Sequence, residues 1–397
     1  MTRSVGTVAW GVRTPIFSKN DDLINLLPDI LIQASQEANF ELRDRDVLAI
    51  TESIVARTQG NYASIYDIEK DLRKKLNGHK TLALTFPILS RNRFASLLAG
   101  FALAVDEVII QLSYPADEVG NHLFPSHLLF EKHINPWQEV FDEQTFAATF
   151  GKSKHPFTGM DYIELYKNIV EQHGAKCTFV FANDVREILN YSKVVLTCDI
   201  HTRHQSKQIL KENGGELILG LDDILNEVSD QHGYNPEYGL LGSNKASDTE
   251  IKLFPRDCQP FVDHLAQKLY EKTNKHIEVM IYGDGAFKDP VGRIWELADP
   301  VVSPAYTPGL KGTPEELKLK YLADNEFKNL TKQEQEAAIK ERLKHKEVKD
   351  ESDAAVGTTP RQITDLLGSL ADLTSGSGDK GTPIVYIQGY FDSYAEN

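Results

Sequence analysis

The chain has 397 residues, a formal net charge of −15 and an apolar content of 41%. Its length exceeds what one ordinary hydrophobic core holds, so we expect two or three domains. The acidic balance argues against broad binding of nucleic acids or anionic membranes, because both need a basic surface.

The cysteines and the hydropathy pattern indicate a reducing compartment. Cys177, Cys198 and Cys258 lie far apart without a CxxC pair, which argues against a zinc site or a disulfide framework. Apolar runs stay well short of the about 20 residues that a membrane-spanning helix needs. Glycine, proline and charges interrupt residues 1–23, unlike a signal peptide. We therefore expect a cytoplasmic protein without membrane or nucleic-acid partners.

The chain begins with a predicted strand, a helix and a second strand. Residues 4–12 alternate in polarity and end at a turn that contains Thr14 and Pro15. The segment 20–22 supplies an N-cap for a helix with an apolar face from residue 23 to residue 31. The apolar run 47–50 predicts the second strand, which leads into a polar segment.

Residues 81–120 predict a strand, an apolar helix and another strand. Arg91 and Arg93 flank Asn92 at the expected start of that helix. Two cations at this place suit an anionic ligand and equally a solvated first turn. Asp117 and Glu118 then precede a glycine, and either site chemistry or turn chemistry explains them.

Strands and helices alternate at short spacing from about residue 157 to residue 227, which predicts a small parallel βαβ domain. Asp199, His201 and His204 follow one of its strands. Because no third histidine lies nearby, we interpret them as a polar strand-end loop and not as a metal site. This unit contains neither a GxxxxGK[ST] loop nor a GxGxxG fingerprint, which argues against an unrelated phosphotransferase built on it.

The stretch 282–300 follows a predicted buried strand and concentrates residues that carry chemistry. Asp284, Asp289 and Arg293 lie there among glycines. Two carboxylates can hold Mg²⁺ or Mn²⁺, and an arginine can neutralise phosphate with two hydrogen bonds. An acidic surface turn explains the same composition, so both interpretations stay open from this stretch alone.

The C-terminal part contains a charged region and a glycine-rich loop. Residues 314–352 are dense in Lys and Glu, which predicts one or two solvated helices that form a soluble face, a lid or a dimer arm. The loop 375–383 (SGSGDKGTP) precedes a strand. Its small residues allow backbone N–H groups to form an anion-binding nest.

Taken in this order, the motifs resemble the coenzyme F-420:L-glutamate ligases, the gamma-glutamyl ligases of the deazaflavin pathway. The resemblance covers roughly residues 5–120 and 232–390 as dispersed short motifs. Those motifs are the segments 11–16 (GVRTPI), 20–23 (NDDL), 45–60 (RDVLAITESIVARTQG), 239–244 (GLLGSN), 251–257 (IKLFPRD), 282–300 and 375–383.

The resemblance implies an α/β fold, with an α+β ligase-like core and an inserted small parallel βαβ domain. Residues 1–120 and 232–397 would form the core, with the charged helical segment 314–352 in its second part. Residues 121–231 have no counterpart in the family and would form the inserted α/β domain.

The family chemistry implied for this chain is amide formation. ATP or GTP, with Mg²⁺ or Mn²⁺, would phosphorylate a carboxylate acceptor. The amine of an amino acid, glutamate in the family, would then attack the acyl phosphate to form a gamma-glutamyl bond. We also expect a homodimer.

The resemblance assigns Asp284, Asp289 and Arg293 as catalytic residues. Asp284 and Asp289 are the metal candidates, and the alignment leaves open which of them is the main ligand. Arg57 stands where the family has a phosphate-contacting lysine. The nucleotide-binding residues that the resemblance implies are Thr14, Pro15, Ser53, Arg57, Ser243, Asn244, Gly376, Gly378 and Lys380.

Several positions depart from the family pattern. Leu241 stands at a metal-binding aspartate, Gly285 or Pro290 at a Ser/Thr ligand, and Ser377 at a Glu/Gln. These departures favour an alternative in which the scaffold binds a nucleotide or metabolite without catalysis. The acidic residues of 284–299 (Asp284, Glu296 and Asp299) favour retained metal binding.

Overall fold

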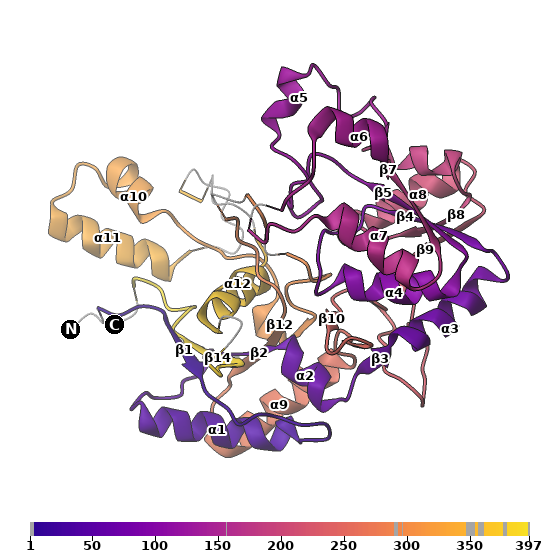
Figure 1. Cartoon of the computed structure of the whole chain (residues 1–397). Helices are drawn as coiled ribbons and strands as arrows, with labels where there is room; N and C mark the ends of the chain where they lie inside the picture. Colours follow the sequence, from indigo (N-terminus) through magenta and orange to yellow (C-terminus); the bar gives the residue numbers. More distant parts are fainter. Residues whose placement is uncertain are drawn as a thin grey trace.

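The computed structural model describes residues 4–155, 157–289, 293–295, 297–346, 354–355, 361–375 and 379–395. The described strands form three sheets (Figure 1). The first has the order β1–β14–β2–β12–β13, and its strands are β1 (Val8–Val12), β14 (Ile384–Gln388), β2 (Val47–Thr51), β12 (Glu278–Tyr282) and β13 (Ala305–Tyr306). Only β2 and β12 run parallel among these described neighbours.

Helices cover both faces of this first sheet (Figure 1). Successive side chains of a strand point to opposite faces, and β2 follows this rule. Leu48 and Ile50 pack with α1 (Leu23–Glu37) and α9 (Cys258–Thr273), whereas Val47 and Ala49 pack with α12 (Ile363–Ser375). As the sequence predicts, Asp22 caps α1, because the Asn25 amide donates to its carboxylate at 3.2 Å.

The second sheet has six strands in the order β6–β7–β5–β4–β8–β9. All neighbouring strands run parallel except the β6–β7 pair. The strands are β4 (Thr81–Thr85), β5 (Glu107–Leu112), β6 (Phe141–Asp142), β7 (Lys176–Phe181), β8 (Val194–Thr197) and β9 (Leu217–Gly220). Buried parallel strands need helices on both faces, which explains their continuous apolar runs.

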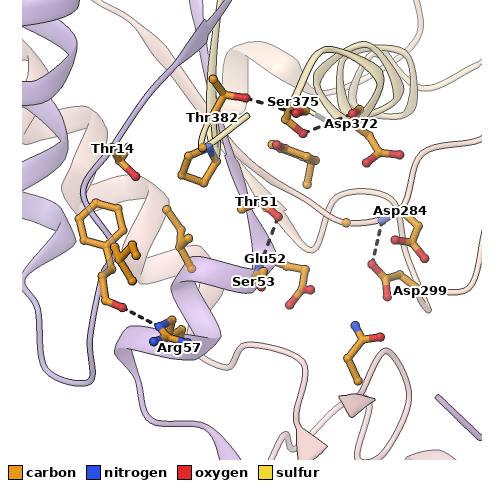
Figure 2. A pocket seen from close by; sticks show the side chains of 18 of the residues that line it. Thr14, Thr51, Glu52, Ser53, Arg57, Asp284, Asp299, Asp372, Ser375 and Thr382 are labelled. Carbon is orange, nitrogen blue, oxygen red and sulfur yellow. Dashed lines mark hydrogen bonds between the residues drawn. The ribbon is translucent and has the colours of Figure 1, made fainter. Parts of the chain in front are cut away.

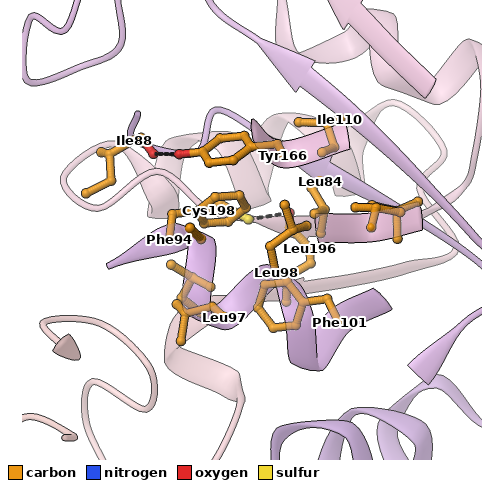
Figure 3. Packing of buried hydrophobic residues seen from close by; sticks show 14 of the residues in the cluster. Leu84, Ile88, Phe94, Leu97, Leu98, Phe101, Ile110, Tyr166, Leu196 and Cys198 are labelled. Atoms are coloured by element: carbon orange, nitrogen blue, oxygen red, sulfur yellow. Dashed lines mark hydrogen bonds between the residues drawn. The ribbon is translucent and has the colours of Figure 1, made fainter. Parts of the chain in front are cut away.

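One face of the second sheet is covered by α3 (Ile65–Leu76), α4 (Phe94–Ala104) and α7 (Tyr162–Gln172). Figure 3 shows Phe94 and Phe101 of α4 packed near Leu84 and Leu196 of the sheet. The other face packs against η1 (Val185–Asn190) and α8 (Arg203–Glu212). The hydrophobic core is therefore divided between the two large sheets, and helices pack on both faces of each sheet.

A small antiparallel sheet and several short elements complete the fold. The small sheet has the order β10–β11–β3, with β10 (Asn244–Lys245), β11 (Glu250–Lys252) and β3 (Tyr62–Ser64). The remaining elements are α2 (Glu52–Thr58), α5 (His127–Glu131), α6 (Glu143–Phe150), η2 (Leu221–Asp223), η3 (Pro308–Leu310), α10 (Leu319–Tyr321), η4 (Leu322–Glu326) and α11 (Lys332–Lys344). None of the described helices has both the length and the apolar character that a membrane crossing needs.

The α/β fold class is confirmed, and the charged segment 314–352 is helical over α10, η4 and α11, which project from the sheets (Figure 1). Its residues 347–352 lie outside the described part. Sheet membership, however, does not follow the predicted boundary between residues 120 and 121. β4 and β5 belong to the same sheet as β7, β8 and β9, because their hydrogen-bonding edges pair with strands from the segment 121–231.

Phe101 is fully buried in the hydrophobic core of the second sheet. Phe130 of α5, by contrast, is 81% exposed. We expect Phe101→Ala to lower the free energy of unfolding by about 4 kcal/mol, because it removes a buried ring and leaves a cavity. Phe130→Ala is the matched control and should leave stability unchanged. Urea denaturation followed by circular dichroism measures both, and equal stability of the two variants would contradict this packing.

Candidate functional site

A cavity of about 530 Å³ lies at the carboxyl ends of β2 and β12 (Figure 2). Because these two strands are parallel, the segments that follow both of them reach the same edge of the sheet. Thr51 and Glu52 follow β2, whereas Gly283 and Asp284 follow β12. The loops 14–17 and 381–383 and the end of α12 close the remaining sides.

Four carboxylates line one part of the cavity: Glu52, Asp284, Asp299 and Asp372. Asp299 approaches the chain at Gly283, where a Cβ atom would overlap with its carboxylate. The Asp284 amide donates to Asp299 Oδ2 at 2.8 Å, and the Gly285 amide donates to Asp372 Oδ2 at 3.0 Å. Glycines thus allow a backbone turn to gather the carboxylates that follow β12.

Arg93 connects two of these carboxylates to the second sheet. It follows β4 at the start of α4, and its guanidinium contacts Asp284 Oδ2 at 2.7 Å and Asp299 Oδ1 at 2.8 Å. Burial opposes the charged form of Arg93. The carboxylates of Asp299 and Asp284 outweigh that effect and raise the pKa of Arg93. The acidic side of the cavity is therefore partly neutralised from outside the first sheet.

Glu52 forms a second buried ion pair at the site. Both oxygens of its carboxylate accept hydrogen bonds from Lys252 Nζ, at 2.8 and 2.7 Å. Burial raises the pKa of Glu52, and the ammonium of Lys252 opposes this effect. This pair joins the start of α2 to β11 of the small sheet.

Asp372 reaches the cavity from α12. Burial raises the pKa of its carboxyl group, the hydrogen bond from the Gly285 amide opposes that effect, and the nearby Asp299 adds to it. Figure 2 shows Asp372 above Asp284 and Asp299, with Glu52 between this group and Arg57. Carboxylates from three separate elements therefore face one space.

Arg57 lies at the opposite side of the cavity from Asp284 (Figure 2). Its Nε atom donates to the Phe17 carbonyl at 2.6 Å, which holds the guanidinium beside the loop 14–17. In that loop the Thr14 amide donates to the Gly381 carbonyl at 3.2 Å. The cavity thus has an acidic side and a cationic side.

Most of the predicted site residues within the described part meet in this cavity. Thr14, Pro15, Ser53, Arg57, Asn244 and Asp284 line it. Ser243 is adjacent in sequence, but its side chain is buried and its hydroxyl donates to the Leu240 carbonyl at 2.7 Å. Ser243 therefore stabilises its own turn.

Asp289 and Arg293 do not line the cavity. The Arg293 amide donates to the Asp289 carbonyl at 2.8 Å, and the Asp289 amide donates to the Ile294 carbonyl at 3.0 Å. Arg293 adopts a positive φ of 60° in this turn. The two residues are thus joined by backbone hydrogen bonds outside the cavity lining, and of the two competing aspartates Asp284 is the one that lines the cavity.

The glycine-rich loop is described only in part. Gly376 and Gly378 lie outside the described residues, as do Pro290, Glu296 and Ser377. Lys380 is exposed, and its neighbour Gly381 lines the cavity. Leu241 is buried in the core of the second sheet and cannot supply a ligand.

Glu52, Arg93 and Asp372 are site residues whose roles the sequence alone did not identify. Arg93 carried a signal, since it follows a predicted strand and precedes a helix. Asp372 lies seven residues after Asp365 in the segment that forms α12. Residues at this spacing share a helix face, so a helical projection of this segment could have found Asp372.

The donor set suits a hard cation that is shared with a ligand. Within the described residues no three His, Cys, Asp or Glu side chains are grouped so that they could hold a metal ion by themselves. Mg²⁺ in proteins is usually bound by one or two carboxylates together with phosphate oxygens and water. Asp284, Asp299 and Asp372 offer such carboxylates, and a nucleotide would supply the rest.

Comparison with known proteins gives one family. The family model described as F420-0:Gamma-glutamyl ligase matches residues 11–389, nearly the whole chain. No curated protein matches the chain. The matched range includes all the residues that line the cavity.

Arg93→Gln should destabilise the fold, because it leaves the carboxylate of Asp299, only 2% exposed, without its charged partner. We expect a loss of about 3 kcal/mol in the free energy of unfolding. The control is Arg186→Gln, whose pair with Asp184 lies at the surface and should contribute nothing measurable. Urea denaturation measures both variants, and an unchanged midpoint for Arg93→Gln would show that the junction does not stabilise the fold.

Proposed function

The chain belongs to the F420-0:gamma-glutamyl ligase family, and from this premise we propose an amide-forming reaction. The protein joins the amine of an amino acid, with glutamate as the first candidate, to a carboxylate-bearing acceptor. ATP or GTP is the co-substrate, with Mg²⁺ or Mn²⁺. The observation that carries this proposal is one cavity where distant segments of the matched range bring carboxylates opposite an arginine.

The proposed reaction has two steps. An oxygen of the acceptor carboxylate attacks the γ-phosphorus, the bond to the β-phosphate oxygen breaks, and the nucleoside diphosphate leaves. The amine nitrogen then attacks the acyl carbon, inorganic phosphate leaves, and the nitrogen loses a proton. A bound divalent ion would offset the phosphate charge in the first step.

The residues of the cavity divide the proposed binding tasks. Arg57 neutralises phosphate oxygens from one side, while Thr14, Ser53 and Asn244 supply polar groups that orient the nucleotide. Lys380 adds a positive charge next to the loop that closes the cavity. Asp284 and Asp372 would hold the divalent ion, and Arg93 fixes the orientation of Asp284.

The charge of the cavity supports a cation in this proposal. Four carboxylates and one arginine line it. A triphosphate would meet repulsion from the carboxylates unless a cation lies between the two groups. The proposal therefore requires that nucleotide and divalent ion bind together.

A second candidate function is binding of a nucleotide or metabolite without turnover. Two observations favour it: Leu241 is buried where the family has a metal-binding aspartate, and Arg93 already pairs with Asp284 and Asp299. Calorimetry separates the two functions. Nucleotide binding without phosphate release, for every amino acid and acceptor supplied, would favour this second candidate.

Phosphate release from ATP or GTP should require Mg²⁺ or Mn²⁺, an amino acid and a carboxylate acceptor, all together. A screen of carboxylate metabolites, with products scored by mass spectrometry, identifies the acceptor. With that acceptor, Asp284→Asn and Asp372→Asn should lower turnover by about two orders of magnitude, because each removes a proposed ligand. Asp106→Asn is the matched control, because Asp106 is an exposed aspartate just before β5.

Asp289→Asn tests the choice between the two aspartates. Since Asp289 lies beyond the cavity, its replacement should affect turnover much less than Asp284→Asn does. Full activity of both Asp284→Asn and Asp372→Asn would overturn the metal assignment. A large loss for Asp289→Asn alone would transfer that assignment to Asp289.

We also propose a homodimer, with the projecting segment α10–η4–α11 as its arm. Leu322 and Ile339 of this segment pack with Ala354 in a small apolar cluster, and the exterior of α11 is charged. Sedimentation velocity should show a species of twice the mass of one chain at micromolar concentration. A single species with the mass of one chain would contradict the dimer.

A further inference from the structure

Two cations of the protein itself are built into the acidic side of the cavity. Arg93 comes from the start of α4 on the second sheet, and Lys252 comes from β11 of the small sheet. Their side chains are only 16% and 10% exposed, and both form ion pairs with carboxylates that line the cavity. The acidic side of the cavity therefore contains fixed positive charge before any ligand binds.

These two cations do not balance the carboxylates of the cavity, which are Glu52, Asp284, Asp299 and Asp372 (Figure 2). Arg93 and Lys252 contact three of the four. Within the described residues no ion pair includes the fourth, Asp372, and its Oδ2 atom accepts a hydrogen bond from the Gly285 amide. Two negative charges remain, which is the charge that one divalent ion neutralises.

The guanidinium of Arg93 lies where two of these carboxylates converge. Its NH2 group donates to Asp284 Oδ2 at 2.7 Å, and its NH1 group donates to Asp299 Oδ1 at 2.8 Å. The Asp284 amide donates to the other oxygen of Asp299, so the two carboxylates are fixed around one cation. In phosphoryl-transfer sites with two metal ions, the ions lie about 3.5–4 Å apart. A second ion beside Asp284 and Asp299 would need the place that Arg93 takes.

The space behind Arg93 is apolar and small. A cavity of about 20 Å³ lies there, which is room for about one water molecule. Its lining is mostly apolar and includes Leu97, Leu240, Leu241 and Ala298. Arg93 could leave the carboxylates on this side only by burying its charge without a counterion, which would destabilise the folded state. The guanidinium is therefore a permanent cation of the site.

We propose that Arg93 takes the place of a second metal ion, so that each chain binds a single divalent ion together with its nucleotide. Asp284 and Asp372 would hold that ion. Because an arginine stays charged at every physiological pH, this part of the positive charge does not depend on the metal concentration. The inference rests on the proposed ligase function for its nucleotide and metal. It adds the number of ions, and it gives the second sheet, residues 81–220, a role in the reaction.

Manganese titrations count the ions. The full-length protein is saturated with the β,γ-imido analogue of ATP or of GTP, neither of which can transfer its terminal phosphate. Bound Mn²⁺ is then followed by electron paramagnetic resonance. We expect one Mn²⁺ per chain, without the spin coupling that two ions about 4 Å apart produce. Two coupled Mn²⁺ ions per chain of the wild type would overturn the proposal.

Variants of Arg93 test the replacement directly. Arg93→Gln should bind a second Mn²⁺ per chain, because Asp284 and Asp299 then lack a counterion. Arg93→Lys keeps a positive charge and should still bind one. The matched control is Arg186→Gln, at a surface arginine of the second sheet unit, which should also bind one. A folded Arg93→Gln variant that binds only one Mn²⁺ would contradict the replacement.

Stability gives a second measurement, because Arg93→Gln is expected to weaken the fold. Millimolar Mn²⁺ should raise the urea midpoint of Arg93→Gln more than that of the wild type, since an ion then substitutes for the lost guanidinium. Equal shifts in the two proteins would contradict this substitution. If Arg93→Gln does not fold, the counts for the wild type and for Arg93→Lys still decide, and two ions in either one would overturn the proposal.

The ion count and turnover fail independently of each other. Turnover by a wild-type protein that binds two Mn²⁺ ions would overturn the role of Arg93 and leave the ligase function intact. One bound Mn²⁺ with nucleotide, but no turnover with any acceptor, would support the role of Arg93 and contradict the ligase function. A wild-type protein that binds nucleotide without any Mn²⁺ would overturn the single-ion proposal.

Discussion

The ion pairs of Arg93 hold together the parts of this molecule from which the site is made. Arg93 begins α4 on the second sheet, whereas Asp284 and Asp299 belong to the turn that follows β12 of the first sheet. A buried carboxylate without a charged partner destabilises the folded state. The carboxylates after β12 therefore require the guanidinium of Arg93, and the guanidinium requires the carboxylates. The two sheets are therefore linked through the functional residues themselves, and the acidic side of the cavity depends on a cation from the second sheet.

Charge also organises the space around that junction. Carboxylates gather on one side of the cavity, and Arg57 lies on the other. The proposed nucleotide and divalent ion would together match these opposite charges. The local charge of the cavity therefore differs from side to side, although the whole chain has a net charge of −15.

The local patterns of the chain predicted many of its elements. The apolar run 47–50 corresponds to β2, Asp22 caps α1, and the alternating region after residue 157 forms parallel strands. The motif residues Thr14, Ser53, Arg57, Asn244 and Asp284 all reach one cavity. The pairing of distant strands could not be predicted, because nothing in the sequence of β4 and β5 shows that β4 pairs with β8 and β5 with β7.

The sequence by itself determined the family, the α/β class and the residue types of the site, because short motifs and apolar periodicity are local properties of the chain. Only the tertiary structure showed that Asp284 lines the cavity and Asp289 does not, since five residues of sequence do not show which carboxylate faces inward. It also brought in Glu52, Arg93 and Asp372 from three separate helices. Such residues are found only when packing is known, because burial and ion pairing depend on neighbours that lie up to about two hundred residues away.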